Sequence, residues 1–186
     1  MRTFAMGERA FGGKGTPDDL AAMQRELRDA MEAGAIGFTT SLSDSHIRPD
    51  GGPVASRYAD WEEIRQLVLA MGSTGHGLFE LAREQASTRS DDPAVRKASN
   101  DRLRDLAVES GVPITFGVSA GSRGTRELLN LIDETCAAGG RMFGQTHSRG
   151  ISHMLSFRGK LQFDSLPAWR AVRSLPVEQQ LVELRK

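Results

Sequence analysis

A helix followed directly by a β-strand is encoded in residues 16–41, TPDDLAAMQRELRDAMEAGAIGFTTS. Thr16 is suited to the N-cap of this helix and Pro17 to its first turn, and apolar residues then recur at helical spacing. Gly34 is suited to the left-handed position that follows a helix end. Residues 35–40 form a short β-prone run, so this part of the chain predicts one helix–strand unit.

The same order of helix and strand recurs three more times along the chain. Asp60 and Asp92 are suited to the N-caps of a second and a third helix. Thr125 begins a fourth helical pattern, in which Cys136 shares the apolar face and is predicted to be buried. The four strands are expected at residues 35–40, 78–81, 112–118 and 141–146. Such alternation predicts a parallel sheet with right-handed crossovers.

Two architectures accommodate four helix–strand units: an open doubly wound sheet and part of a (β/α) barrel. A complete eight-stranded barrel takes about 250 residues, and this chain has 186. The predicted fold class is therefore α/β, as a partial (β/α) TIM-type barrel of about four βα units with parallel strands. We expect a single domain over residues 1–186, in which residues 160–186 form a C-terminal helical tail.

The composition argues against several classes of protein. Lys and Arg together number 24, as do Asp and Glu, so the formal net charge is zero. A neutral chain lacks the basic surface that nucleic acids and anionic membranes attract, and neither is an expected partner. The single cysteine excludes a disulfide framework within the chain and a cysteine-based zinc site. The first residues contain no apolar segment of the kind found in secretory signal peptides, which predicts a cytoplasmic protein.

Candidate site residues follow the first and the fourth predicted strands. Functional residues of parallel sheets gather at the carboxyl ends of the strands. His46 and Arg48 follow the first strand, and His147 and Arg149 follow the fourth. Neither His-x-His nor His-Glu-x-x-His occurs in the chain, so no residue is assigned a metal-binding or catalytic role. These four residues are predicted to face a ligand, and the arginines to pair with a carboxylate.

Six stretches of the chain share one family resemblance. They are RTFAMGERA (2–10), TPDDLAAM (16–23), AMEAGAIGFTTS (30–41), PITF (113–116), the helical pattern over 128–140 and PAWR (167–170). They resemble the middle of N-acyl-D-amino-acid deacylases, the D-aminoacylase-like members of the amidohydrolase superfamily. The resemblance covers nearly the whole chain, and residues 34–41 are its most specific part.

This resemblance implies part of a metal-dependent barrel that hydrolyses a non-peptide amide bond in a small molecule, using a zinc-bound water and an aspartate. His46, Arg48, His147 and Arg149 would then bind the substrate. The family's metal-binding histidines, near the ends of its fifth and sixth strands, would match residues 79–82 and 116–119, which contain no histidine. We therefore expect zinc in full-length members of the family but no zinc bound by this chain alone. Because the barrel is expected to be incomplete, we also expect no independent catalysis.

Two other functions stay open. A half barrel leaves two exposed strand edges, which favour a homo-oligomer or the complementation of another chain without any catalysis. The turn SAGSRG at residues 119–124 lies at the start of the fourth helix, where backbone N–H groups bind anions. It lacks the first glycine of the dinucleotide fingerprint, and no acid ends the next strand. A module that binds a phosphate-bearing ligand is thus the third hypothesis.

Overall fold

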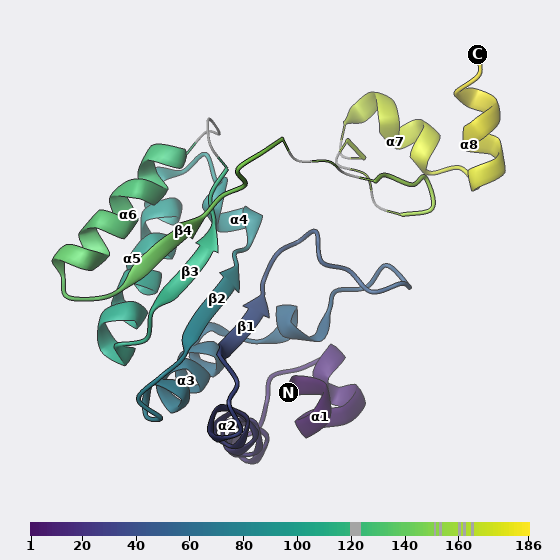
Figure 1. The fold of residues 1–186 in the computed structure, drawn as a ribbon. Helices are drawn as coiled ribbons and strands as arrows, with labels where there is room; N and C mark the ends of the chain where they lie inside the picture. Colours follow the sequence, from purple (N-terminus) through teal and green to yellow (C-terminus); the bar gives the residue numbers. More distant parts are fainter. Residues whose placement is uncertain (120–123, 151, 153, 160, 162, 165) are drawn as a thin grey trace. The chain divides into compact units, whose positions relative to one another are not determined.

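The computed structural model describes residues 1–119, 124–150, 152, 154–159, 161, 163–164 and 166–186. Four strands form one parallel sheet in the order β1-β2-β3-β4, and helices alternate with them along the chain (Figure 1). The predicted α/β fold of about four βα units with parallel strands is confirmed, in an arrangement consistent with a partial (β/α) barrel. The chain divides into two compact units, Met1–Thr146 and His147–Lys186.

The first unit contains the sheet and most of the helices. Its elements are α1 (Arg2–Met6), the 3-10 helix η1 (Gly7–Phe11), α2 (Pro17–Glu32), β1 (Gly37–Ser41), the 3-10 helix η2 (Ala55–Tyr58), α3 (Trp61–Gly72), β2 (Leu78–Ala82), α4 (Gln85–Thr88), α5 (Pro93–Ser110), β3 (Ile114–Gly117), α6 (Thr125–Ala137) and β4 (Met142–Gln145). All four predicted helix–strand units are present. The short helices α1, η1, η2 and α4 have no counterpart in the sequence prediction.

The second unit contains α7 (Pro167–Arg173) and α8 (Val177–Glu183), both within the residues predicted to form a helical tail. Arg173 connects the two helices, since its guanidinium donates hydrogen bonds of 2.7 Å to the Asp164 carboxylate and to Gln180 Oε1. The Trp169 ring packs against the Phe163 ring, with 4.5 Å between their centroids. Among the described residues of the whole chain, no helix combines the length and apolar character needed to cross a membrane.

The long helices begin at the residues that the sequence marks as caps. At the start of α2, the Thr16 hydroxyl accepts a hydrogen bond from the Asp19 N–H and the Asp19 carboxylate accepts one from the Thr16 N–H. The Asp60 and Asp92 carboxylates accept N–H groups from the first turns of α3 and α5. Gly111 ends α5 with a φ of 65°, a conformation that favours glycine. Local side-chain chemistry therefore sets the helix bounds.

The start of α2 is expected to lose stability in acid. Hydrogen bonds from the Arg9 guanidinium, at 2.6 and 2.9 Å, and from Thr16 hold the pKa of Asp19 well below its usual range. Because the pKa is lower in the folded chain than in the unfolded one, this stabilisation is present above the ordinary aspartate pKa of about 4 and is lost as the pH falls below it.

Asp19→Asn is therefore expected to weaken the dependence of stability on pH between about pH 5 and pH 2. Urea unfolding midpoints measured across that range test this expectation. Asp18→Asn, at an exposed position in the same helical turn, is the matched control. An Asp19→Asn chain whose stability falls in acid as steeply as that of the control would contradict it.

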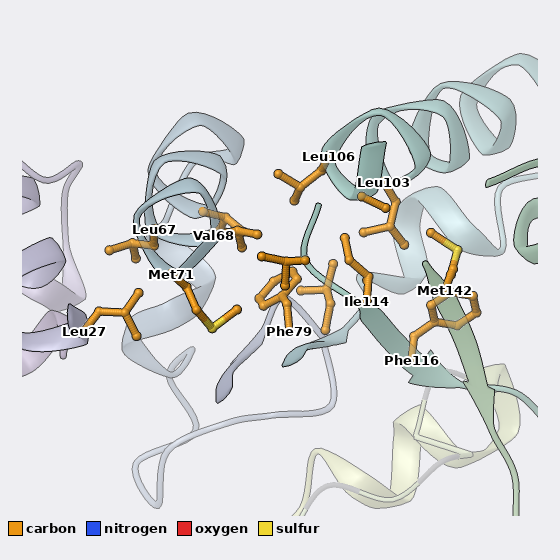
Figure 2. Packing of buried hydrophobic residues seen from close by; sticks show 14 of the residues in the cluster. Leu27, Leu67, Val68, Met71, Phe79, Leu103, Leu106, Ile114, Phe116 and Met142 are labelled. Carbon is orange, nitrogen blue, oxygen red and sulfur yellow. The ribbon is translucent and has the colours of Figure 1, made fainter. Parts of the chain in front are cut away.

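The core lies between the sheet and one layer of helices. Phe38, Phe79, Ile114 and Met142 are register partners across the four strands, and their side chains form one row on the helix side. The rings of Phe38 and Phe79 stack with 5.5 Å between their centroids. The helices contribute Leu27 from α2, Leu67, Val68 and Met71 from α3, and Leu103 and Leu106 from α5 (Figure 2).

Among the described residues of the first unit, no helix layer covers the other face of the sheet (Figure 1). The next register row consists of Thr39, Glu80, Thr115 and Phe143, which point away from the helices because strand side chains alternate. Phe143 is 52% exposed, whereas Phe79, on the helix side, is 0% exposed. The strand order never reverses, and α2, α3, α5 and α6 pack in sequence on one face (Figure 1). This is the layering of a (β/α) barrel wall, whereas a doubly wound sheet has helices on both faces.

The buried face of α6 differs from the prediction. Leu131 and Thr135 are buried and Cys136 is exposed, so the predicted burial of Cys136 is wrong. The Thr135 hydroxyl donates to the Leu131 carbonyl, 2.7 Å away, and is thereby hydrogen-bonded inside the core. Because threonine can satisfy its hydroxyl within its own helix, a polar residue occupies the position expected for an apolar one.

Arg2 joins the amino-terminal segment to the rest of the first unit. Its side chain is 7% exposed and that of Glu63 is 9% exposed, and Arg2 Nε lies 2.9 Å from Glu63 Oε1. The guanidinium also donates hydrogen bonds of 2.6 Å to the carbonyls of Ala10 and Gly13. One buried cation thus connects α1, η1 and α3.

Candidate functional site

The carboxyl ends of β1 and β2 border an open depression of about 290 Å³. Its charged and aromatic lining comes from five residues that are far apart in the sequence: Asp44, Arg57, Trp61, Glu84 and Arg102. The loop after β1 contributes Asp44 and Arg57, and the segment after β2 contributes Glu84. Trp61 is the first residue of α3, and Arg102 lies within α5. The depression therefore lies at the edge of the sheet where (β/α) folds place their sites.

Both arginines of this depression are paired with carboxylates and half-buried. Arg57 Nη2 lies 2.9 Å from Asp44 Oδ1. Arg102 forms an ion pair with Glu84, and its Cζ lies 4.5 Å from the centroid of the Trp61 ring. A guanidinium presents a planar fork of donors that matches a carboxylate, and it stacks on aromatic rings. The depression thus offers two cations that can exchange an internal carboxylate for that of a ligand.

Arg83 adds a partly buried charge next to this depression. Burial lowers the pKa of its guanidinium to about 10; the neighbouring Glu84 opposes this shift and Arg102 reinforces it. Nη2 donates to Ser99 Oγ at 3.0 Å and to Asn100 Oδ1 at 2.7 Å. Nη1 is buried without a hydrogen-bond partner among the described residues, as is Oε2 of Glu84. Arg83 remains cationic at neutral pH, and such perturbed, incompletely paired charges concentrate at functional sites.

Two of the predicted substrate-binding residues, His46 and Arg48, contact neighbours close to their own loop. His46 Nδ1 shares a 2.6 Å hydrogen bond with Ser41 Oγ. Arg48 is half-buried, with Nη2 3.0 Å from the Asp50 carboxylate and its guanidinium 4.7 Å from the centroid of the Phe11 ring. Neither residue lines the depression. These contacts organise the loop after β1, and the binding role of His46 and Arg48 stays a prediction.

The other two predicted residues, His147 and Arg149, are exposed at the start of the second unit. Their convergence with His46 and Arg48 on one site stays a prediction. The predicted phosphate-binding turn also stays untested, because residues 120–123 lie outside the described part of the chain. Gly124, which follows them, has a φ of 89° and precedes the first residue of α6.

The residues at the strand ends do not fit the zinc that the family resemblance implies. No three His, Cys, Asp or Glu side chains gather in a metal-binding arrangement within the described residues. β2 ends at Ala82 and β3 at Gly117, which have no ligating side chain. The groups that follow β2 are the Arg83 guanidinium and the carboxylate of Glu84, which is already paired with Arg102. No chemical step of this site is therefore assigned to a metal.

Sequence reasoning missed Arg57, Trp61 and Arg102. The two arginines reach the depression from a long loop and from within a helix, so no local pattern marks them. Trp61 is different, because it directly follows the N-cap Asp60. In a βα unit the helix begins at the carboxyl edge of the sheet. An aromatic residue at the start of such a helix can therefore be predicted to lie near that edge.

Comparisons of the chain with protein-family models, with curated proteins and with solved structures gave no match. The resemblance to N-acyl-D-amino-acid deacylases therefore stays an expectation from the sequence. The functional argument depends on the residues of the depression.

Proposed function

We propose that this chain is an amidohydrolase-like protein that binds the carboxylate of an N-acyl amino acid at the carboxyl edge of its parallel sheet. The observation that supports this most is the presence of two arginines, Arg57 and Arg102, in one depression beside Trp61. The resemblance to D-aminoacylases adds the expected reaction class, hydrolysis of an amide C–N bond. The proposed role of this chain is to bind and orient the substrate, and no residue is assigned to the hydrolytic step.

The depression matches the two chemically different ends of such a substrate. A carboxylate accepts paired hydrogen bonds from a guanidinium and replaces Asp44 or Glu84 as its partner. The acyl chain is apolar, and Leu42 and Trp61 provide apolar surface in the same lining. Because Asp44 and Glu84 neutralise the arginines before binding, the ligand substitutes one ion pair for another. Selectivity is therefore expected to depend on the ligand carboxylate.

Replacement of Arg57 is expected to weaken the binding of N-acetyl-D-leucine. Hydrogen bonds to charged groups contribute about 1.5–3 kcal/mol, so Arg57→Met should raise the dissociation constant by about tenfold or more. Isothermal titration calorimetry of the purified chain measures this change, and circular dichroism checks that the variant is folded. Arg102→Met should act in the same direction.

Arg96→Met is the matched control for this experiment. Arg96 lies on α5, as Arg102 does, and forms an ion pair of the same kind with Glu127, but it does not line the depression. The control variant should bind like the unmodified chain. Equal weakening by all three replacements, or no saturable binding of N-acetyl-D-leucine by the unmodified chain, would overturn the proposed function.

Self-association is a second candidate function, and the open face of the sheet favours it. Phe143 is 52% exposed on that face, and β1 and β4 each have one neighbouring strand within the described sheet. Unpaired strand edges form hydrogen bonds with other chains. This candidate requires the mass of two or more chains in light scattering, and a mass of one chain at high concentration would rule it out.

A further inference from the structure

A second cavity, of about 200 Å³, lies beside the outer edge of β1. Three consecutive strand residues, Phe38, Thr39 and Thr40, line it. Side chains of a strand point alternately to opposite faces of the sheet. Three consecutive strand residues can therefore line one cavity only when the cavity runs along the edge of the strand. The cavity is therefore bounded by backbone as well as by side chains.

The hydrogen-bond pattern of β1 shows which backbone groups point into this cavity. The Ile36 carbonyl accepts a 3.2 Å hydrogen bond from the Leu78 N–H of β2. The Leu42 N–H donates a 2.8 Å hydrogen bond to the Ala82 carbonyl, also of β2. Alternate residues of a parallel strand bond to the same side, so the N–H and C=O of Thr39 point away from β2. The Ser41 carbonyl points the same way, because it accepts a 2.7 Å hydrogen bond from Ser56 Oγ. Among the described residues, no hydrogen-bond partner is recorded for the outward groups of Thr39.

The rest of the lining has no unpaired charged side chain for a ligand. The charged side chains are Arg2 and Glu63, which pair with each other, and Arg2 also donates to the carbonyls of Ala10 and Gly13. The remaining lining is largely apolar and includes Met23, Phe38, Ile64 and Leu67. A charged ligand would therefore lose hydration without finding an unpaired side chain of opposite charge.

We infer that this cavity binds a small neutral secondary amide. The ligand N–H donates to the Thr39 carbonyl and the ligand C=O accepts from the Thr39 N–H, as an added strand would. Its apolar substituents pack against Met23, Ile64 and Leu67. The volume lies below the range of about 300–1,000 Å³ of most ligand sites, which favours one amide unit with short substituents over a polypeptide strand. The cavity and the depression that contains Arg57 and Arg102 are neighbours that share one lining residue, Ala59.

The test uses N-isobutylacetamide as the probe and the ¹⁵N-labelled full chain as the receptor. The backbone amide signal of Thr39 should shift with saturation as the probe is added. Isobutyl acetate has nearly the same shape but no N–H donor, and it should bind about fivefold more weakly. Equal binding of the amide and the ester, or saturable shifts that leave Thr39 unchanged, would overturn the inference.

Two variants separate backbone recognition from cavity filling. Thr39→Pro removes the outward N–H, from which the carbonyl of either probe accepts, without removing a bond to β2, and should weaken binding of both probes about fivefold while the amide stays preferred. Thr39→Val keeps the N–H and should bind like the unmodified chain. If Thr39→Pro does not fold, Ala55→Leu, which fills the cavity from η2, should abolish probe binding instead. Binding of the amide that is unweakened in the folded Thr39→Pro chain, or that persists in the Ala55→Leu chain, would contradict the inference, whatever the result for N-acetyl-D-leucine at the depression.

Discussion

Replacing Arg2 with methionine is expected to lower the free energy of unfolding by about 3–5 kcal/mol. The replacement leaves the Glu63 carboxylate, 9% exposed, in a buried position without its cation. It also removes the donor to the Ala10 and Gly13 carbonyls, 2.6 Å from the guanidinium. Breaking one side of a buried pair has a large effect because the remaining charge is neither hydrated nor neutralised. Urea unfolding measures the loss.

Two further variants show whether burial of the pair is the cause. Arg65→Met removes an arginine that pairs with Glu62 and Glu109 at the surface, and should lower the free energy of unfolding far less than Arg2→Met does. Adding Glu63→Leu to Arg2→Met removes the unpaired carboxylate and should recover part of the loss. A loss in Arg2→Met no larger than in Arg65→Met would contradict the buried role of Arg2.

Replacing Phe79 with alanine is expected to lower the free energy of unfolding by about 3–5 kcal/mol. Phe79 is fully buried between β2 and the helix layer (Figure 2), where it stacks on Phe38. Its removal leaves a cavity that the surrounding close-packed side chains fill only in part. Chemical unfolding followed by circular dichroism measures the change.

Phe143→Ala is the matched control, because Phe143 is also a strand phenylalanine but lies on the open face, 52% exposed. Its loss should be below about 1 kcal/mol. Comparable losses in both variants would mean that the open face is covered, which would contradict the one-sided helix layer. A loss in Phe143→Ala that grows with protein concentration would instead support self-association through that face.

The order of helices and strands could be predicted because its signals are local. Thr16, Asp60 and Asp92 mark helix starts by side-chain hydrogen bonds within the following turn. The spacing of apolar residues and the length of each segment then distinguish the helices from the short apolar strands. The exposed Cys136 shows where this reasoning fails, since an apolar residue type does not decide which side of a helix faces the core.

The candidate site was harder to predict because its contacts are distant in sequence. Arg102 pairs with Glu84 across 18 positions, and no local sequence pattern at either residue predicts the other. His46 and Arg48 were predicted from their position after a strand, which gives the correct edge of the sheet but not the contacts of the side chains. Arg48 pairs with Asp50, its neighbour in the loop. The burial and the ion pairs of these side chains are therefore known only from the structure.

The most direct test of the proposed function is a titration of the ¹⁵N-labelled chain with N-acetyl-D-leucine, followed by nuclear magnetic resonance. We predict that the Trp61 indole signal and the side-chain Nε signals of Arg57 and Arg102 shift along one saturation curve, while the Thr39 amide stays unchanged. Saturable shifts confined to other residues, or no shift at the depression at any ligand concentration, would contradict carboxylate binding at the edge of the sheet.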